Sequence, residues 1–354
     1  MNFTYRFPAV KGIQAGREYY ISMVPLKLLS RLFPSDDEIV MPEYRAQRRI
    51  NEARIPEIKR YILENRDTYV FSALSASIDG HFTFTKLVDS DVGILEVDMD
   101  SVFLINDGQH RKAAIEAAME EDSTLGEETI SIVFFGDEGL VRSQQMFTDL
   151  NKHAVKTSNS LATLYDGRDE VAVATRQVIS AVPFFERFTD RERDNLGKNS
   201  SNLLTLNMVY KANQRIIHGG NCSENDTRFL IEFWMLVADN IIEWQEVLNK
   251  TLTKKALREE YIVVLAITIS AFGKLGRYFY DNPTLDMKKY LVNLRKIDWL
   301  RSNVEWMGRT IRPNGKVLNS EESISLTCTL IKSKLGLPLS KEEQQREKHI
   351  MEKK

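Results

Sequence analysis

Segments with the composition of β-strands occur only in the first 160 residues of this 354-residue chain. They are rich in β-branched and aromatic residues, as strands are, and they cover residues 70–78, 82–85, 94–99, 102–105 and 129–135. Asp79 and Gly80 stand between the first two segments and predict a β-hairpin there. The two strands of this hairpin and the other predicted strands need neighbours to pair with. We therefore expect the first 160 residues to contain a β-sheet.

Helical patterns accompany these strands and then continue without them. In the first part they cover residues 42–65, 109–121 and 140–153, with Pro56 expected in a first helical turn. After residue 160 they cover residues 224–246, 257–280, 287–297 and 320–335. We therefore predict an α+β protein with a mixed α/β domain over residues 1–160, a mostly α-helical domain over 161–340 and a charged tail over 341–354. Ser340 and Glu343 form a capping-box pattern at the start of that tail.

The overall composition excludes several classes of protein. Apolar residues make up 43% of the chain, so low-complexity disorder is excluded. Two cysteines, Cys222 and Cys328, are too few for a disulfide framework or a zinc ribbon. The longest apolar run, residues 261–272, is too short to span a bilayer, and the first residues lack the apolar core of a signal peptide. We expect a cytoplasmic protein that does not enter a membrane. Closely spaced aspartates at 89, 91, 98 and 100 are more typical of solvated loops than of a cation site, so no metal site is predicted.

The most informative segment joins a strand to a helix through the residues Asp107, Gly108, Gln109, His110 and Arg111. Glycine permits a sharp turn and a close approach of a ligand to the backbone. The start of a helix favours an anion, and an arginine can grip a phosphate with two hydrogen bonds. This pattern predicts a phosphate-binding turn, for a nucleotide or for DNA. The alternative is a tight turn in which Asp107 only caps the helix.

Basic residues gather in two segments, although the whole chain has a net charge of only −2. Residues 287–318 have a net charge of +6 and include Trp299 and Trp306. Residues 41–66 have a net charge of +3. Both segments suit phosphate contacts, which position a protein on DNA. For residues 41–66 the alternative is a solvated helix with Arg–Glu pairs. For residues 287–318 the alternative is that both tryptophans belong to the core. The residues predicted to contact DNA are Arg45, Arg48, Arg49, Arg54, Arg301, Arg309, Arg312 and Lys316.

The motif INDGQHRKAAI at residues 105–115 is the signature of DGQHR-domain proteins. The chain resembles one family of them, DndB, the B component of the bacterial DNA phosphorothioation (DNA sulfur modification) system. Further segments that carry this resemblance are FPAVKGIQAGREYYISMVPLKLL at 7–29, YVFSALSASIDG at 69–80, SQQMFTDLNKHAV at 143–155 and KIDWLRSN at 296–303. The resemblance implies a ParB/sulfiredoxin-like fold for the first domain, in which a Gly-x-x-Arg turn holds nucleotide phosphates. Here that turn is Gly108 to Arg111, and Asn151 is matched to the helix that closes the pocket.

The resemblance also implies a function. Proteins like DndB are regarded as accessory to the modification enzymes and as transcriptional regulators of their own operon. The expected partners are double-stranded promoter DNA, other phosphorothioation proteins and a second copy of the chain. Two alternatives stay open: a nucleotide-dependent enzyme, either an NTPase or a DNA-nicking enzyme, built on the DGQHR turn with ATP or another nucleotide and Mg²⁺, and a scaffold for the modification complex. No P-loop and no spacing typical of a catalytic triad supports the enzyme, so no catalytic residue is assigned.

Overall fold

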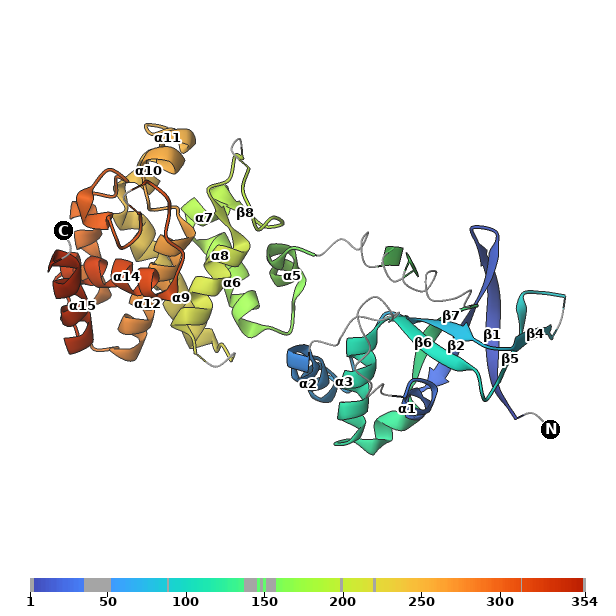
Figure 1. The fold of residues 1–354 in the computed structure, drawn as a ribbon. Coiled ribbons are helices and arrows are strands. Elements are labelled where there is room, and N and C mark those ends of the chain that lie inside the picture. Colours follow the sequence, from blue (N-terminus) through green and yellow to red (C-terminus); the bar gives the residue numbers. More distant parts are fainter. Residues whose placement is uncertain are drawn as a thin grey trace. The chain divides into compact units, whose positions relative to one another are not determined.

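The computed structural model describes residues 3–34, 52–87, 89–136, 145–146, 149–150, 157–197, 200–218, 221–312 and 314–352. Its contacts divide the chain into two compact units, Met1–Val155 and Lys156–Lys354. The first contains a seven-stranded mixed sheet and the second is mostly helical (Figure 1). This confirms the predicted mixed α/β part followed by a helical part.

The first unit is built on a sheet whose strand order is β4-β5-β1-β2-β7-β3-β6. Within it, β3 and β7 are parallel and every other pair is antiparallel. The strands are β1 (Thr4–Gln14), β2 (Arg17–Pro25), β3 (Leu74–Asp79), β4 (Phe82–Lys86), β5 (Val92–Asp98), β6 (Val102–Asp107) and β7 (Thr129–Gly136).

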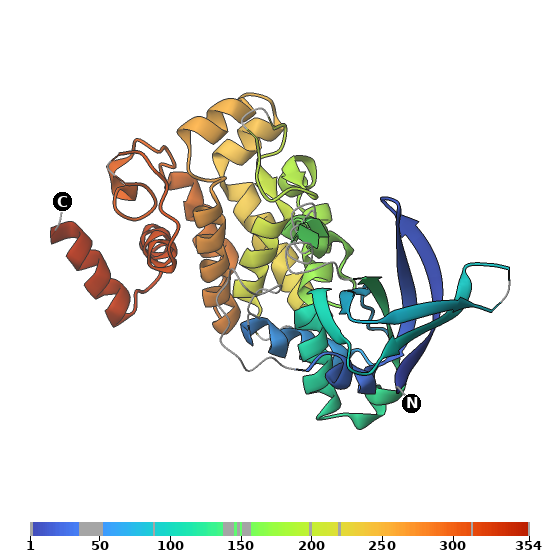
Figure 2. The same ribbon diagram turned by 45° about the vertical axis from the view of Figure 1, so that its right-hand side comes forward.

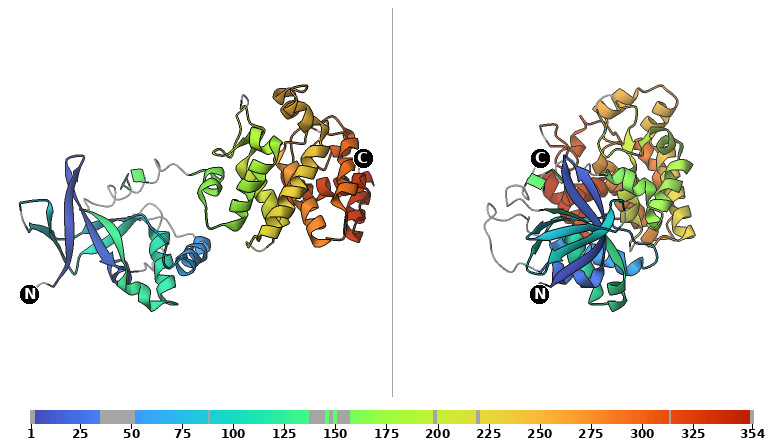
Figure 3. Two further views of the ribbon diagram at one scale, coloured as in Figure 1. Left: turned by 180° about the vertical axis from the view of Figure 1, so that it is seen from behind. Right: turned by 90° about the vertical axis from the view of Figure 1, so that its right-hand side faces the viewer.

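The predicted hairpin at Asp79 and Gly80 is wrong. β3 pairs with β6 and β7, whereas β4 pairs with β5 near the opposite edge of the sheet. Three Cα–Cα steps join Asp79 to Phe82 and reach at most about 11 Å, whereas five strand spacings in a flat sheet cover about 24 Å. The sheet therefore curls strongly (Figure 3), and the end of β3 comes close to the start of β4. The hairpin signal depends only on neighbouring residues, whereas β3 pairs with β6 and β7, which lie further along the chain.

The concave side of the curled sheet holds the core of the first unit. Phe134 of β7 lies with its ring centroid 5.6 Å from that of Phe7 of β1 and 5.8 Å from that of Phe103 of β6. The helices of this unit are α1 (Leu29–Leu32), α2 (Ile55–Glu64) and α3 (Gln109–Met119), with short 3₁₀ turns η1 (Leu26–Leu28), η3 (Glu52–Arg54) and η4 (Ser123–Glu127). Pro56 lies in the first turn of α2, as predicted. α3 buries Ala114, Ile115 and Ala118.

The second unit consists mostly of helices (Figure 2). They enclose a core rich in aromatic residues. Phe184 and Trp244 are stacked with ring centroids 4.4 Å apart. The elements are α5 (Asn159–Tyr165), α6 (Glu170–Ala181), α7 (Pro183–Phe188), β8 (Thr189–Asp190), β9 (Leu204–Thr205), α8 (Leu206–Ile216), α9 (Glu224–Asn240), α10 (Ile242–Leu248), α11 (Lys254–Glu260), α12 (Ala266–Asp281), α13 (Met287–Leu291), η5 (Val292–Lys296), η6 (Val304–Trp306), α14 (Glu321–Leu335) and α15 (Lys341–Glu352).

Two helices predicted as continuous are interrupted in this unit. The pattern at 224–246 is divided at Ile241, which adopts an extended conformation between α9 and α10. The pattern at 257–280 is interrupted at 261–265, where backbone hydrogen bonds join Ile262 to Trp299 and Arg301 to Glu260. These long-range hydrogen bonds replace the hydrogen bonds of a helix. The spacing of apolar residues in the sequence cannot reveal such an interruption. None of the described helices has the length and apolarity to cross a membrane.

Candidate functional site: the DGQHR turn and the basic segments

The strand, the turn and the helix of the DGQHR motif form as predicted. β6 ends at Asp107, Gly108 makes the turn and α3 begins at Gln109. Gly108 has φ +106°, in the left-handed region, and a Cβ placed on it would lie 2.3 Å from Leu74 Cδ2. Both the conformation and the space require glycine at this position. Among the described residues no side chain caps α3, so the alternative in which Asp107 only caps the helix is wrong.

Replacing Gly108 by alanine is expected to destabilise the protein. The new methyl group meets Leu74, and φ is strained for any residue with a Cβ, so the loss is roughly 1–3 kcal/mol. Urea unfolding of the full chain measures it. Gly167→Ala is a matched control, because a Cβ there meets nothing within 4 Å. Equal stability of the two variants would contradict the role assigned to Gly108.

The guanidinium group of Arg111 is held by groups of the protein. Its Nη1 donates hydrogen bonds to the carbonyl oxygens of Ser72, at 2.8 Å, and Ala73, at 3.1 Å, and to the Ser72 hydroxyl. Its Nη2 lies 2.5 Å from Asp107 Oδ2, and the arginine side chain is only 16% exposed. Arg111 therefore fastens the segment before β3 to the turn. In this arrangement a phosphate must displace the carboxylate of Asp107 to reach the arginine.

The remaining residues predicted at the turn differ in how they are placed. Gln109 and His110 are half-buried in the first turn of α3. Asn151 lies outside the described residues. Asn106, which the sequence analysis did not select, is fully buried beside the motif and donates to Ser77 Oγ at 2.7 Å. Its Oδ1 has no hydrogen-bond partner among the described residues, so an acceptor is available within the fold at this point.

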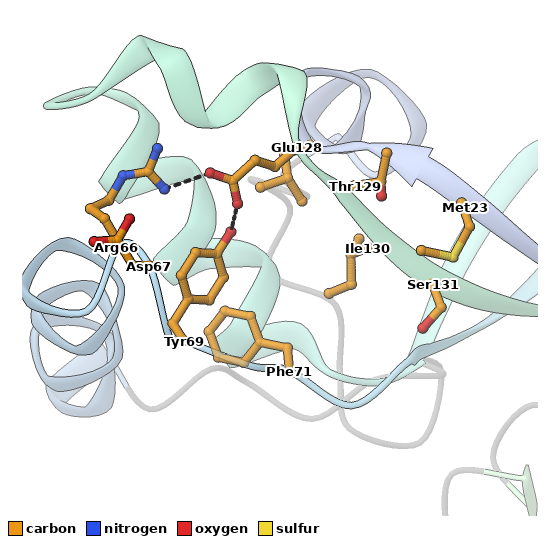
Figure 4. A pocket seen from close by; sticks show the side chains of 10 residues that line it. Met23, Arg66, Asp67, Tyr69, Phe71, Glu128, Thr129, Ile130 and Ser131 are labelled. Carbon is orange, nitrogen blue, oxygen red and sulfur yellow. Dashed lines mark hydrogen bonds and ion pairs between the residues drawn. The ribbon is translucent and has the colours of Figure 1, made fainter. Parts of the chain in front are cut away.

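A pocket of about 270 Å³ has Tyr69 and Phe71 in its lining. Both residues lie within three positions before Ser72, whose carbonyl oxygen, like that of Ala73, accepts from Arg111. Figure 4 shows Glu128 between Arg66 and the hydroxyl of Tyr69. Arg66 Nη1 donates to Glu128 Oε1 at 2.7 Å, and Tyr69 donates to Oε2. Burial, together with the hydrogen bond to Glu128, raises the pKa of Tyr69 to about 12. The phenol is therefore neutral at physiological pH and fixes the carboxylate.

The predicted DNA contacts of the first unit can be placed only in part. Arg45, Arg48 and Arg49 lie outside the described residues. Arg54 is exposed at the end of η3, immediately before α2. Its exposed side chain is compatible with the predicted contact with DNA.

Two arginines predicted to contact DNA from the second unit are engaged by other groups of that unit. Arg301 donates hydrogen bonds to the carbonyl oxygens of Tyr261, at 3.1 Å, and Arg258, at 2.7 Å, and burial lowers its pKa. Arg309 is 1% exposed and forms an ion pair with Glu347 of α15. The prediction that Arg309 lies on an exposed surface is therefore wrong, because α15 returns to cover it.

The two tryptophans of the basic segment are core residues. Trp299 and Trp306 are each 1% exposed and stack on each other with ring centroids 5.4 Å apart. The indole nitrogen of Trp306 donates to the carbonyl oxygen of Asp298 at 2.8 Å. Of the two interpretations left open by the sequence, core packing is the one that the geometry supports, and neither ring is available to stack on a base.

Arg312 and Lys316 remain exposed. They face each other across a tight turn, in which the amide of Arg312 donates to the carbonyl oxygen of Lys316 at 2.8 Å. An isolated bridge between Ile311 and Val317 closes the base of this turn. Among the described residues neither cation has an acidic partner, and both side chains can meet solvent or phosphate.

The closely spaced aspartates at 89, 91, 98 and 100 lie in or beside β5. Asp91 lies 3.4 Å from Lys86 Nζ in a solvated ion pair. Within the described parts of the chain, no group of three or more histidine, cysteine, aspartate or glutamate side chains could hold a metal ion.

Comparison with known proteins supplies the decisive observation about identity. A family model, DndB, described as DNA-sulfur modification-associated, matches residues 7–338. The chain belongs to the DndB family. Neither the curated proteins nor the solved structures gave a match. Membership in DndB associates the chain with DNA sulfur modification. The matched residues extend over parts of both units and include the DGQHR turn and the loop of Arg312.

The structure adds residues that the sequence analysis missed. Ser72 and Ala73 hold Arg111, and Glu347 holds Arg309. Ser72 lies within the segment at 69–80 that carries the resemblance to DndB, so that segment was a usable signal. Glu347 is 38 residues from Arg309, and no local pattern joins the two.

Proposed function

We propose that this DndB-family chain is a DNA-binding transcriptional regulator and an accessory protein of DNA phosphorothioate modification, acting on the promoter region of its own operon. The observation that carries the DNA-binding part is the turn of Arg312 and Lys316, which presents two exposed cations without an acidic partner in the described chain. Such cations neutralise phosphates and release counterions, which drives most binding to DNA.

Other exposed cations of the same segment support this surface. Lys288 and Lys289 lie in α13 and Lys296 ends η5, and each is exposed. In the described structure none of the three forms an ion pair with a carboxylate. Their contacts with phosphate would position the protein, whereas a preference for the promoter requires base contacts or DNA shape.

A reporter assay tests the regulatory part. The promoter of the operon is fused to a reporter gene and the full chain is supplied from a second plasmid. We expect repression by the wild-type chain and release of repression by Arg312→Glu/Lys316→Glu, with protein levels confirmed by immunoblot. Unchanged reporter output with and without the chain would exclude regulation of this promoter. A role restricted to the modification complex, as a scaffold, would then be favoured.

A second candidate function is nucleotide binding at the DGQHR turn, which could support an NTPase or a DNA-nicking activity. It is favoured by the start of α3, where no side chain of the described residues forms a cap, and by the position of Asp107, whose side chain is 44% exposed and competes for Arg111. The ligand proposed is ATP or another nucleotide with Mg²⁺.

Asp107→Asn tests whether phosphate competes with this carboxylate. Asparagine keeps a hydrogen-bond acceptor for Arg111 but removes the charge, so the affinity for a nucleotide is expected to rise about tenfold, the effect of losing roughly 1.4 kcal/mol of competing attraction. Titration calorimetry with ATP and with CTP measures it, and turnover of each is followed in parallel. Absence of binding and turnover in both the wild type and Asp107→Asn, with ATP and with CTP, would exclude the site.

A further inference from the structure

Two buried cations lie beneath the C-terminal helix α15. Arg309, in the loop after η6, is 1% exposed, and the side chain of Lys332, on α14, is 6% exposed. Each is covered by one carboxylate of α15: Glu347 lies on Arg309 and Glu343 lies on Lys332. Glu343 and Glu347 are four residues apart, so both carboxylates project from the same face of the helix. Figure 2 shows α15 at the edge of the helical unit.

Each cation also has an anchor that does not belong to α15. Arg309 Nη1 donates to the carbonyl oxygen of Glu305 at 2.9 Å. Lys332 Nζ lies 4.3 Å from the centroid of the Tyr278 ring, a cation–π contact. The cations would therefore keep their positions if α15 departed, and their remaining donors would face an open site.

The carboxylates bind these donors in the way a phosphate does. Arg309 Nε donates to Glu347 Oε1 at 3.1 Å and Nη2 donates to Oε2, so the pair is bidentate. Lys332 Nζ contacts both oxygens of Glu343 at 2.8 Å. Paired oxygens on an arginine fork and on an ammonium group are equally the contacts of a phosphodiester.

Two ion pairs fasten α15 to the rest of the second unit. None of its described residues belongs to the hydrophobic core of the second unit. Its sequence, KEEQQREKHIME, contains only two apolar residues, Ile350 and Met351, and a helix of twelve residues is marginal without packing. Buried ion pairs contribute little net stability, because desolvation offsets their attraction. A hollow of about 780 Å³ separates parts of α15 from α12 and α14. The helix can therefore be displaced by a stronger polyanion.

We propose that Arg309 and Lys332 form a second phosphodiester-binding site, which α15 occupies as an intramolecular competitor of DNA. This inference rests on the proposed function, since it assumes that the chain binds DNA. Arg309 lies on the same loop as Arg312, joined to it through the bridged residue Ile311. Release of α15 would extend the exposed cations of this loop by Arg309, so the helix would set the affinity of the regulator for its operator.

The test compares three full-length proteins: wild type, Glu347→Gln and Glu342→Gln. Glu342 is the matched control, because it is on the same helix, its side chain is 83% exposed and its ion pair is with Arg346 of α15 itself. In Glu347→Gln the new amide oxygen can still accept a hydrogen bond from Arg309, which protects the fold, and thermal unfolding checks this. We expect Glu347→Gln to bind a promoter duplex about five- to a hundredfold more tightly, the usual range for coupled events, and Glu342→Gln to match the wild type.

Hydrogen exchange of the α15 amides provides the second measurement. Promoter DNA, and separately inorganic tripolyphosphate, should accelerate this exchange in the wild type. Tight DNA binding with equal affinity for all three proteins and protected α15 amides would overturn the α15 inference and leave the proposed function standing. Absence of DNA binding, with exchange still accelerated by tripolyphosphate, would overturn the proposed function but support the phosphate chemistry of the site. Protection under every condition, without DNA binding, would overturn both.

Discussion

Trp306→Ala is expected to lower the free energy of unfolding by about 3–5 kcal/mol, the usual loss for removal of a large buried aromatic side chain. Trp306 is 1% exposed, stacks on Trp299 and donates its indole hydrogen to Asp298. Its removal leaves a cavity and a carbonyl group without its donor. Urea unfolding of the full chain, followed by circular dichroism, measures the loss.

The control for this substitution is Val304→Ala, because Val304 is 68% exposed in the same 3₁₀ turn and its truncation should change stability by no more than about 0.5 kcal/mol. The comparison also separates the two interpretations of the tryptophans. If Trp306 stacked on DNA, its loss would weaken binding and leave stability intact. That pattern would contradict the assignment to the core.

Arg312→Glu/Lys316→Glu is expected to weaken binding of promoter DNA on the order of a hundredfold at physiological salt, because two attractive charges become repulsive. Both side chains are exposed, so the fold should persist. Fluorescence anisotropy with a labelled promoter fragment measures the affinity. Neutral Arg312→Ala/Lys316→Ala should reduce the slope of log affinity against log salt by about 2, one for each lost phosphate contact.

A charge reversal elsewhere on the protein is the appropriate control for this experiment. Lys255→Glu changes an exposed cation of α11, far from the loop in sequence, and should leave the affinity close to that of the wild type. If Lys255→Glu weakened DNA binding equally, only the net charge of the protein would matter, and the loop of Arg312 and Lys316 would have no specific role in binding.

Local signals in the sequence predicted local structure well. The glycine in DGQHR placed the start of α3 at Gln109, and the capping-box pattern placed the start of α15. There the amide of Ser340 donates to Glu343 at 2.7 Å and the amide of Glu343 donates to Ser340 at 3.2 Å. Each of these features depends on residues no more than four positions apart, whose types determine the backbone geometry directly.

Features that depend on distant partners could not be predicted from the sequence. Gly80 signals a turn, but it does not show that β3 pairs with β6 and β7. Arg309 is a charged residue in a basic segment and was expected on the surface, but α15 returns to cover it. Arg111 lies in the first turn of α3, yet its hydrogen bonds to Ser72 and Ala73 depend on how the chain approaches β3. Nucleotide binding at this turn stays a prediction.

The central claim is that this DndB-family chain binds the promoter DNA of its own operon through the exposed cations of its second unit. Anisotropy titrations of the wild-type chain, with the promoter fragment and with a scrambled fragment of equal length, test it over a series of salt concentrations. The account predicts tighter binding to the promoter and an affinity that falls steeply with salt. Equal and salt-independent affinities for both fragments, or no binding to either, would contradict it.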